Sequence, residues 1–170
     1  MEHTDNRLAR RWRHFITGTG ATRRMFPQAT LDAITQAIAA GEQAHRGELR
    51  FIVETALPGP AIWAGQSIRQ RALALFAEHG VWDTADNCGV LLYVNVAERK
   101  VEIVADRALN ARVGADEWQA ICRAMTEGFK SGRFEQAALD AVQAVHGLLR
   151  REFPATDGGA NELPDAPLVI

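Results

Sequence analysis

Residues 87–107 read NCGVLLYVNVAERKVEIVADR and contain the two segments that decide the fold. Apolar runs over 89–96 and 100–105 are separated by only three residues. A connection of that length is typical of a hairpin, so the two runs are predicted to be strands that pair antiparallel. The first run is apolar on both faces, which predicts that helices cover both sides of the sheet.

A further strand and several helices are predicted around this hairpin. Residues 49–55 (LRFIVET) are rich in β-branched and aromatic side chains, as a strand requires. A helical stripe from Ile68 to His79 separates this strand from the hairpin, so it should run parallel to the strand at 89–96 through a right-handed crossover. Other helical stripes lie at 30–47, 118–132 and 134–148. The sequence therefore predicts an α/β fold, a three-layer α/β/α sandwich with a small mixed β-sheet.

Composition divides the chain into three parts. Residues 26–154 are predicted to form the α/β/α domain. Residues 1–25 contain a basic amphipathic helix and a Thr-Gly-Thr-Gly linker. Residues 155–170, here called the C-terminal tail, show no periodicity and predict an extended segment that ends in three aliphatic residues. Such a tail is expected to gain contacts along a groove or a sheet edge, of its own domain or of another subunit, so an oligomer through the tail is one hypothesis.

The first helix leaves two interpretations open. Four apolar side chains fall on one face and form what we call the N-terminal stripe: Leu8, Trp12, Phe15 and Ile16. Arginines decorate the rest of the helix. The stripe could pack against its own domain with the arginines in solvent, or the helix could make a peripheral membrane contact or bind RNA. The formal net charge of −2 gives no bulk attraction to nucleic acid, so no nucleic-acid partner is expected.

The remaining bulk features favour a cytoplasmic protein. No apolar run approaches the length of a transmembrane segment, and the N-terminus has no apolar core like that of a secretory signal. The two cysteines, Cys88 and Cys122, lie in apolar surroundings and are expected to be buried free thiols. That usage fits a reducing compartment.

Polar residues gather where the hairpin meets the loop before it. The last predicted strand ends on Asp106, and because the hairpin reverses direction, this end lies beside the start of the strand at 89–96. The stretch 83–87 leads into that same start. We therefore expect four residues to converge at one edge of the sheet, and we call them the acidic rim: Asp83, Asp86, Asn87 and Asp106.

The acidic rim offers oxygen ligands to a cation. Carboxylates and a side-chain amide suit calcium or magnesium rather than zinc, which prefers His and Cys ligands. Glu54 and Thr84 are assigned to the same neighbourhood, and Arg107 and Arg71 are candidate partners for an anion or for the carboxylates.

An interpretation without a metal also fits these residues. Asp83 and Asp86 would then shape turns, and Asp106 would pair with an arginine. Common catalytic motifs are missing from the sequence: it has no Gly-x-Ser-x-Gly, no P-loop and no His-Glu-x-x-His. No histidine stands at a sequence spacing from Cys88 that would indicate a catalytic pair, and His45 and His79 are interpreted as helix-end residues. No catalytic residue is therefore assigned.

The stretch GVWDTADNCGVLLYVNVAERKVEIVADRAL, residues 80–109, resembles the TPM domain family. The resemblance extends over roughly residues 26–154 and includes the segments at 47–54 and 129–134. It implies an α/β/α sandwich, calcium binding at the acidic rim and a phosphatase activity that has been proposed for some members. Cys88 stands where asparagine is common and Ala108 where glycine is usual. Without a signal peptide or membrane anchor, the chain is similar to the stand-alone cytoplasmic subgroup.

Two functions follow as hypotheses. The favoured one is a non-catalytic binding module for a divalent cation, a protein partner or both. The alternative is a metal-dependent phosphatase of low activity, in which the cation polarises the phosphate and Arg107 stabilises charge.

Overall fold

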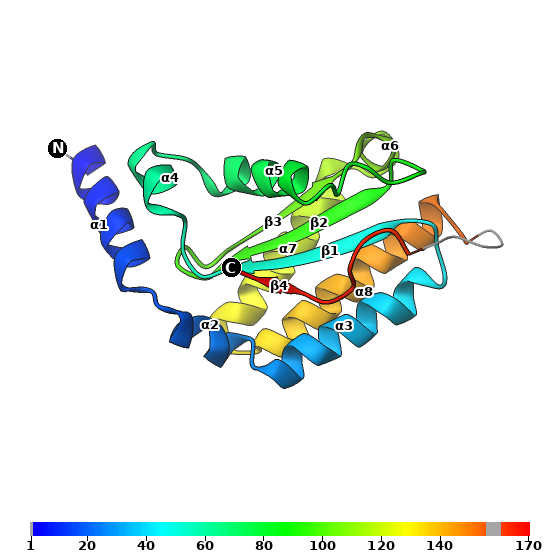
Figure 1. Ribbon diagram of the computed structural model, residues 1–170, viewed down its shortest axis with the longest axis horizontal. Helices are drawn as coiled ribbons and strands as arrows, with labels where there is room; N and C mark the ends of the chain where they lie inside the picture. Colours follow the sequence, from blue (N-terminus) through cyan, green and yellow to red (C-terminus); the bar gives the residue numbers. More distant parts are fainter. Residues whose placement is uncertain (1, 156–160) are drawn as a thin grey trace.

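The computed structural model describes residues 2–155 and 161–170. It shows the predicted α/β sandwich, in which helices cover both faces of one mixed sheet (Figure 1). The strands are β1 (Glu48–Glu54), β2 (Gly89–Asn95), β3 (Lys100–Ala105) and β4 (Leu168–Val169). The helices are α1 (Glu2–Ile16), α2 (Thr19–Met25), α3 (Gln28–Glu42), α4 (Gly59–Trp63), α5 (Ile68–Glu78), α6 (Arg107–Asn110), α7 (Ala115–Lys130) and α8 (Phe134–Glu152).

The strand order is β3-β2-β1-β4. β1 and β2 are parallel, with Glu48 opposite Gly89 and Glu54 opposite Asn95. β2 and β3 form the antiparallel hairpin. Both pairings are those that the sequence predicts, because a helical crossover connects the first pair and a short turn over residues 96–99 connects the second.

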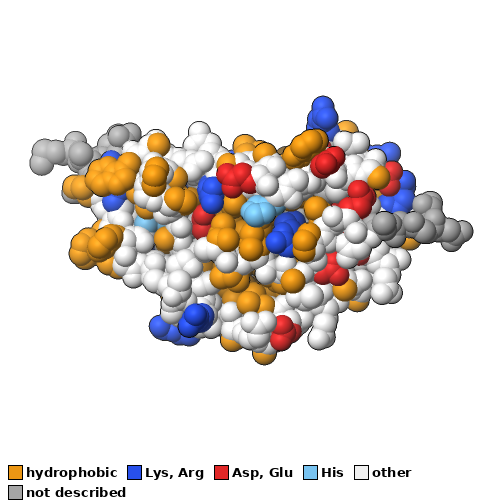
Figure 2. Space-filling view, viewed as in Figure 1, with side chains coloured by type: hydrophobic (Ala, Val, Ile, Leu, Met, Phe, Trp, Pro, Cys, Tyr) orange, Lys and Arg blue, Asp and Glu red, His pale blue; other side chains and the backbone are white. Residues whose placement is uncertain are grey.

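The N-terminal arm differs from its prediction. Thr19 already begins α2, so two of the four residues of the predicted linker at 17–20 are helical. The interpretation in which the N-terminal stripe packs on the domain is wrong, because its four side chains are 59% to 83% exposed. Figure 2 shows hydrophobic side chains gathered at the left end of the molecule, where Figure 1 places α1 and α4. The opposite, polar side of α1 contacts the domain instead.

The C-terminal tail adds a strand to the sheet of its own chain. β4 runs parallel to β1, with Ile52 opposite Leu168 and Val53 opposite Val169. The Arg50 guanidinium donates to two carbonyl oxygens of the tail, that of Pro164 at 2.8 Å and that of Ala166 at 2.6 Å. The predicted contact with a sheet edge is therefore made within this chain, while a contact with another subunit stays a prediction.

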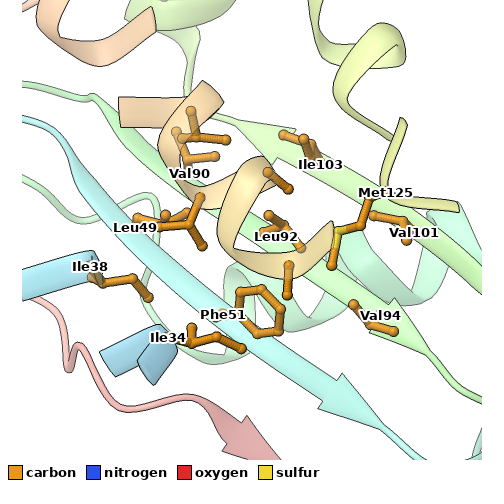
Figure 3. Packing of buried hydrophobic residues seen from close by; sticks show 14 of the residues in the cluster. Ile34, Ile38, Leu49, Phe51, Val90, Leu92, Val94, Val101, Ile103 and Met125 are labelled. Atoms are coloured by element: carbon orange, nitrogen blue, oxygen red, sulfur yellow. The ribbon is translucent and has the colours of Figure 1, made fainter. Parts of the chain in front are cut away.

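Two apolar cores lie on the two faces of the sheet. The larger one packs α3, α7 and α8 against the sheet, and Figure 3 shows Ile34, Ile38 and Met125 among its helical members. The smaller core packs α5 against the other face. The middle strands alternate between the two cores: Leu92 faces the larger one, and Leu91 and Tyr93 face the smaller one. This arrangement explains why β2 is buried on both faces, as the apolar run predicts.

Candidate functional site

The loop between α5 and β2 carries most of the acidic rim, and its shape is set by short-range hydrogen bonds. The Asn87 N–H donates to the Thr84 carbonyl at 3.0 Å, and the Cys88 N–H donates to the Thr84 hydroxyl at 3.1 Å. Asn87 has a φ of 51°, in the left-handed region that asparagine tolerates better than most residues. Thr84 is buried beneath the loop, whereas Asp83 is exposed.

Asp106 reaches the rim from the end of β3. Its backbone N–H donates to the Gly89 carbonyl at 2.9 Å, which places it beside the start of β2 as predicted. One carboxylate oxygen, Oδ1, accepts from the Arg107 N–H at 2.6 Å and caps α6. The side chain is only 6% exposed, and its other oxygen, Oδ2, has no hydrogen-bond partner among the described residues. An unpaired buried carboxylate oxygen costs stability, so Asp106 calls for a donor or a cation.

The rest of the acidic rim has other partners. The Asp86 carboxylate accepts from the Arg46 guanidinium at 2.9 Å in a half-exposed ion pair. Arg107 is exposed next to Asp106. Among the described side chains, which lie within residues 8–155 and 161–170, no three His, Cys, Asp or Glu side chains lie close enough to hold a metal ion. The residues that the sequence predicts as ligands therefore border one sheet edge without forming a coordination shell in this structure.

The C-terminal tail passes the same edge and adds a carboxylate that the sequence pattern does not reveal. Glu162 accepts from the Ala85 N–H, at 3.0 Å and 3.2 Å to its two oxygens. Glu48, at the start of β1, accepts from the Leu163 N–H at 3.1 Å. These contacts join residues more than 70 positions apart along the chain, which a local motif search cannot detect.

Glu54 and Arg71 lie at the other end of the sheet. Since β1 and β2 are parallel, Glu54 is opposite Asn95 rather than the start of β2. Its carboxylate accepts from Arg71 at 2.8 Å and 3.0 Å and from the Tyr93 hydroxyl. Burial, followed by the contact with Glu54, raises the pKa of Tyr93 above its usual value. This ion-pair network borders the smaller core and extends through Arg71 to the exposed Glu78, and the structure does not bring it to the acidic rim.

A second titratable cluster is fully enclosed between α3 and α8. His45 and His146 stack with ring centroids 4.9 Å apart, and His45 Nε2 lies 2.7 Å from His146 Nδ1. Burial lowers the pKa of each imidazole to about 4. Nearby, burial raises the pKa of Glu42 to about 8, with the charges of Glu48 and Asp165 adding to the effect. His45 is thus a core residue rather than a free helix end.

Both cysteines are poor nucleophiles in this structure. Burial raises the pKa of the Cys88 thiol to about 12 and that of the Cys122 thiol to about 11. The Cys88 thiol also donates to the Arg46 carbonyl at 3.2 Å. Thiols with such pKa values remain protonated at neutral pH, and the thiolate is the reactive form.

The TPM domain family matches residues 22–148, which is most of the chain. The chain belongs to the TPM domain family. The match spans α3 to α7, most of α8 and the first three strands, so it covers the whole acidic rim except what the C-terminal tail contributes.

Among the solved structures similar to this chain, one covers most of its length. It is the NMR structure of the BA42 protein from the psychrophilic bacterium Bizionia argentinensis sp. nov.. The identity is 27%, the similarity covers 84% of this chain and 93% of BA42, and the TM-score is 0.73. No functionally curated protein is detectably similar in sequence to this chain. Within the described residues, none of the helices has the length and hydropathy needed to cross a membrane.

Proposed function

We propose that this TPM domain is a non-catalytic binding module whose ligand-facing surface is the acidic rim. Asp106 carries the proposal. Its carboxylate is buried at the rim, and Oδ2 lacks a partner among the described residues. A buried polar atom without a hydrogen bond costs roughly 1–3 kcal/mol, which a bound cation or a donor group would offset.

The chemistry of the rim favours a hard divalent cation. Asp83, Asp86 and Asp106 supply carboxylate oxygens, Asn87 supplies an amide oxygen, and calcium and magnesium prefer such ligands. Glu162, held against the same loop, supplies a further carboxylate. Asp86 is paired with Arg46, so a cation must compete with that guanidinium for its carboxylate. The proposed site is therefore of low affinity and depends on a rearrangement of the loop.

The other titratable groups support binding rather than catalysis. The two thiols are protonated at neutral pH, and the His45–His146 pair is enclosed in the core. Hydrolysis of a phosphate ester needs a base or a nucleophile that reaches the substrate. Arg107, exposed beside Asp106, is the observation that favours the alternative of a slow metal-dependent phosphatase, because it can stabilise an anion.

Thermal unfolding with and without each divalent cation tests the proposal. Calcium, magnesium or manganese at millimolar concentration should raise the melting temperature, since a ligand that binds only the folded state stabilises it by about 2.7 kcal/mol at 100 times its Kd. Asp106→Asn should reduce that rise, whereas Asp140→Asn, on the exposed face of α8, should not.

Two results would contradict the proposal. A melting temperature of the wild type that does not respond to any of the three cations would remove the cation site. Metal-dependent hydrolysis of an aryl phosphate that Asp83→Ala abolishes would establish the phosphatase instead.

A further inference from the structure

Helix α1 is attached to the domain by its polar side. Arg10 and His14 are four residues apart and lie on the side of the helix opposite the N-terminal stripe. The Arg10 guanidinium donates to Glu98 Oε1 at 2.6 Å and to the Gln66 carbonyl at 2.6 Å. Both partners belong to the domain, so α1 is held across the hairpin turn and the loop before α5.

His14 completes this attachment and fixes its own tautomer. Its Nδ1 accepts from the Leu57 N–H at 3.1 Å, so in the neutral ring the proton resides on Nε2. Nε2 then donates to Glu98 Oε1 at 3.0 Å. Burial alone would raise the pKa of Glu98, but the hydrogen bonds from His14 and Arg10 outweigh it and hold that pKa below its usual value. An ionised Glu98 thus receives two donors from one face of α1.

The N-terminal stripe consequently points away from the domain. Trp12 is 63% exposed and Phe15 is 83% exposed. Trp63 of α4, 71% exposed, continues the same apolar surface across a hollow of about 900 Å³, and the Arg11 guanidinium lies 4.3 Å from its ring centroid. The hollow is lined mainly by apolar side chains of α1, α4 and the segment before α4, among them Leu8, Trp12, Phe15, Leu57, Ile62 and Trp63.

The charge around this surface is mainly positive, although α1 also contains Glu2 and Asp5 near its start. Residues 7–27 contain six arginines and no Asp or Glu, while the other 13 basic residues and all 21 acidic residues lie elsewhere in the chain. Arg13 is exposed on one flank of the stripe, and Arg11 lies on the other. Arg23 and Arg24 are exposed on α2. In Figure 2, basic side chains project below the apolar group, where Figure 1 places α2. The overall net charge of −2 hides this local excess.

We propose that the N-terminal stripe, together with Trp63, inserts into the interface of an anionic lipid bilayer. A helix lies in a membrane interface when aromatic and aliphatic side chains occupy one face and arginines flank it. Tryptophan favours this depth because its ring is amphipathic, and arginines near the surface attract anionic headgroups. Here the domain fixes the orientation, because Arg10 and His14 hold the opposite side of the helix.

The same charges disfavour other occupants. A second copy of the chain would bring its own six arginines against the first set, so like charges would repel across the contact. RNA would use the arginines and the aromatic rings but would leave the exposed Leu8 and Ile16 in contact with water or phosphate. An anionic bilayer satisfies both the apolar and the basic parts of the surface.

Vesicle flotation tests the proposal with the whole chain. Wild-type protein should float with vesicles of phosphatidylcholine and phosphatidylserine, and binding should fall at high salt or with phosphatidylcholine alone. The double variant Trp12→Ser, Phe15→Ser should lower the partition coefficient at least about tenfold. Arg11→Gln and Arg13→Gln should each lower it about fivefold, the value of one basic side chain near an anionic surface.

Matched variants separate insertion from a general change in the protein. Leu73→Ser removes an aliphatic side chain that is 47% exposed on α5, and Arg123→Gln removes an exposed arginine on α7. Both should bind vesicles as the wild type does. The altered side chains of the stripe are in solvent, so melting temperatures should match that of the wild type.

Three results would overturn the proposal. The first is the absence of binding to anionic vesicles at any salt concentration, and the second is equal binding by the wild type and the double variant. The third is the absence of vesicle binding together with a different interaction that the double variant loses. That interaction would be self-association, seen by sedimentation velocity, or binding to single-stranded RNA. Failure of the cation response at the acidic rim would leave this proposal unaffected, because the two surfaces share no residue.

Discussion

The C-terminal tail and helix α1 both carry apolar side chains outside the central helices and strands, and the tail buries part of its set, although Val169 and Ile170 remain 43% and 41% exposed. Leu163 is 8% exposed in the smaller core, and β4 pairs with β1. Phe15 of α1 is 83% exposed. The tail finds a free strand edge and two buried charged residues, Arg50 and Glu48, that hydrogen-bond its backbone. Helix α1 forms its backbone hydrogen bonds within itself, and its side chains Arg10 and His14 attach it to the domain. An apolar pattern therefore predicts that a segment makes a contact but does not identify the surface that it contacts.

Deleting the tail and deleting helix α1 should have the most different effects on the free energy of unfolding. Removal of residues 161–170 exposes one side of β1, uncovers the core beneath Leu163 and breaks the hydrogen bonds of Arg50 and Glu48 to the tail, so we expect the free energy of unfolding to fall by about 3–5 kcal/mol. Removal of residues 1–16 breaks the Arg10 and His14 hydrogen bonds and should cost about 1–2 kcal/mol. Urea unfolding followed by circular dichroism measures both. Equal losses would contradict the difference between the two ends.

The pH dependence of stability provides a second, smaller test. The pKa values of His45 and His146 are about 4 in the folded protein against 6.5 for a free histidine, so their contribution is complete above pH 6.5 and is lost as the pH falls towards 4. Glu42, with a pKa of about 8 against 4.5, contributes fully below pH 4.5 and loses this contribution as the pH rises through 8. Two histidines outweigh Glu42 between pH 4.5 and 6.5, and Glu48, whose pKa burial also raises, offsets part of that difference. Stability should therefore peak near pH 6.5, with changes on the order of 2 kcal/mol on each side.

Variants assign the two limbs of that profile. His146→Gln should flatten the acid limb and Glu42→Gln the alkaline limb. Asp165 of the tail helps to raise the pKa of Glu42, so deleting the tail should also change the alkaline limb, whereas deleting residues 1–16 should change neither. Urea midpoints measured from pH 4 to pH 9 test this. A tail deletion with an unaltered alkaline limb would show that the tail and Glu42 are not coupled.

The smallest effect is expected for a single change in the N-terminal stripe. Phe15→Ser should alter the free energy of unfolding by no more than about 0.5 kcal/mol, because the ring is exposed in the folded protein and gains little from folding. A loss above about 1 kcal/mol, measured by the same urea unfolding, would mean that the stripe packs against the domain in solution and is not available to a bilayer.

Much of the fold is predictable because its signals are local. The hairpin at 89–105 follows from two apolar runs and a turn of hairpin length, and the parallel pairing of β1 and β2 follows from the intervening helix. The family resemblance agrees with the match over residues 22–148. The fourth strand is not predictable in this way, since Leu168 and Val169 are too few to show a period of two.

The candidate site is predictable only in part. Asp106 lies beside the start of β2 because an antiparallel hairpin brings those ends together. Glu54 lies at the opposite end of the sheet because β1 is parallel to β2, which places Glu54 beside the end of β2 and not its start. The predicted strand directions therefore determine which polar residues lie together. Glu162 joins the rim only through the path of the tail, and His146 meets His45 only because α8 packs against α3.

The amino-acid sequence alone predicts the α/β class, the antiparallel hairpin, the parallel direction of β1 relative to β2, and the family, because these depend on periodicity, turn length and local motif. Which apolar and charged side chains are buried where the two chain ends meet the domain depends on tertiary contacts. Arg50 and Glu48 are buried in β1 because the tail accepts and donates hydrogen bonds over them. The N-terminal stripe is exposed because Glu98 and the Leu57 N–H bind the other side of α1. Pairings between residues far apart in sequence set these outcomes, and no pattern within one segment encodes the partner.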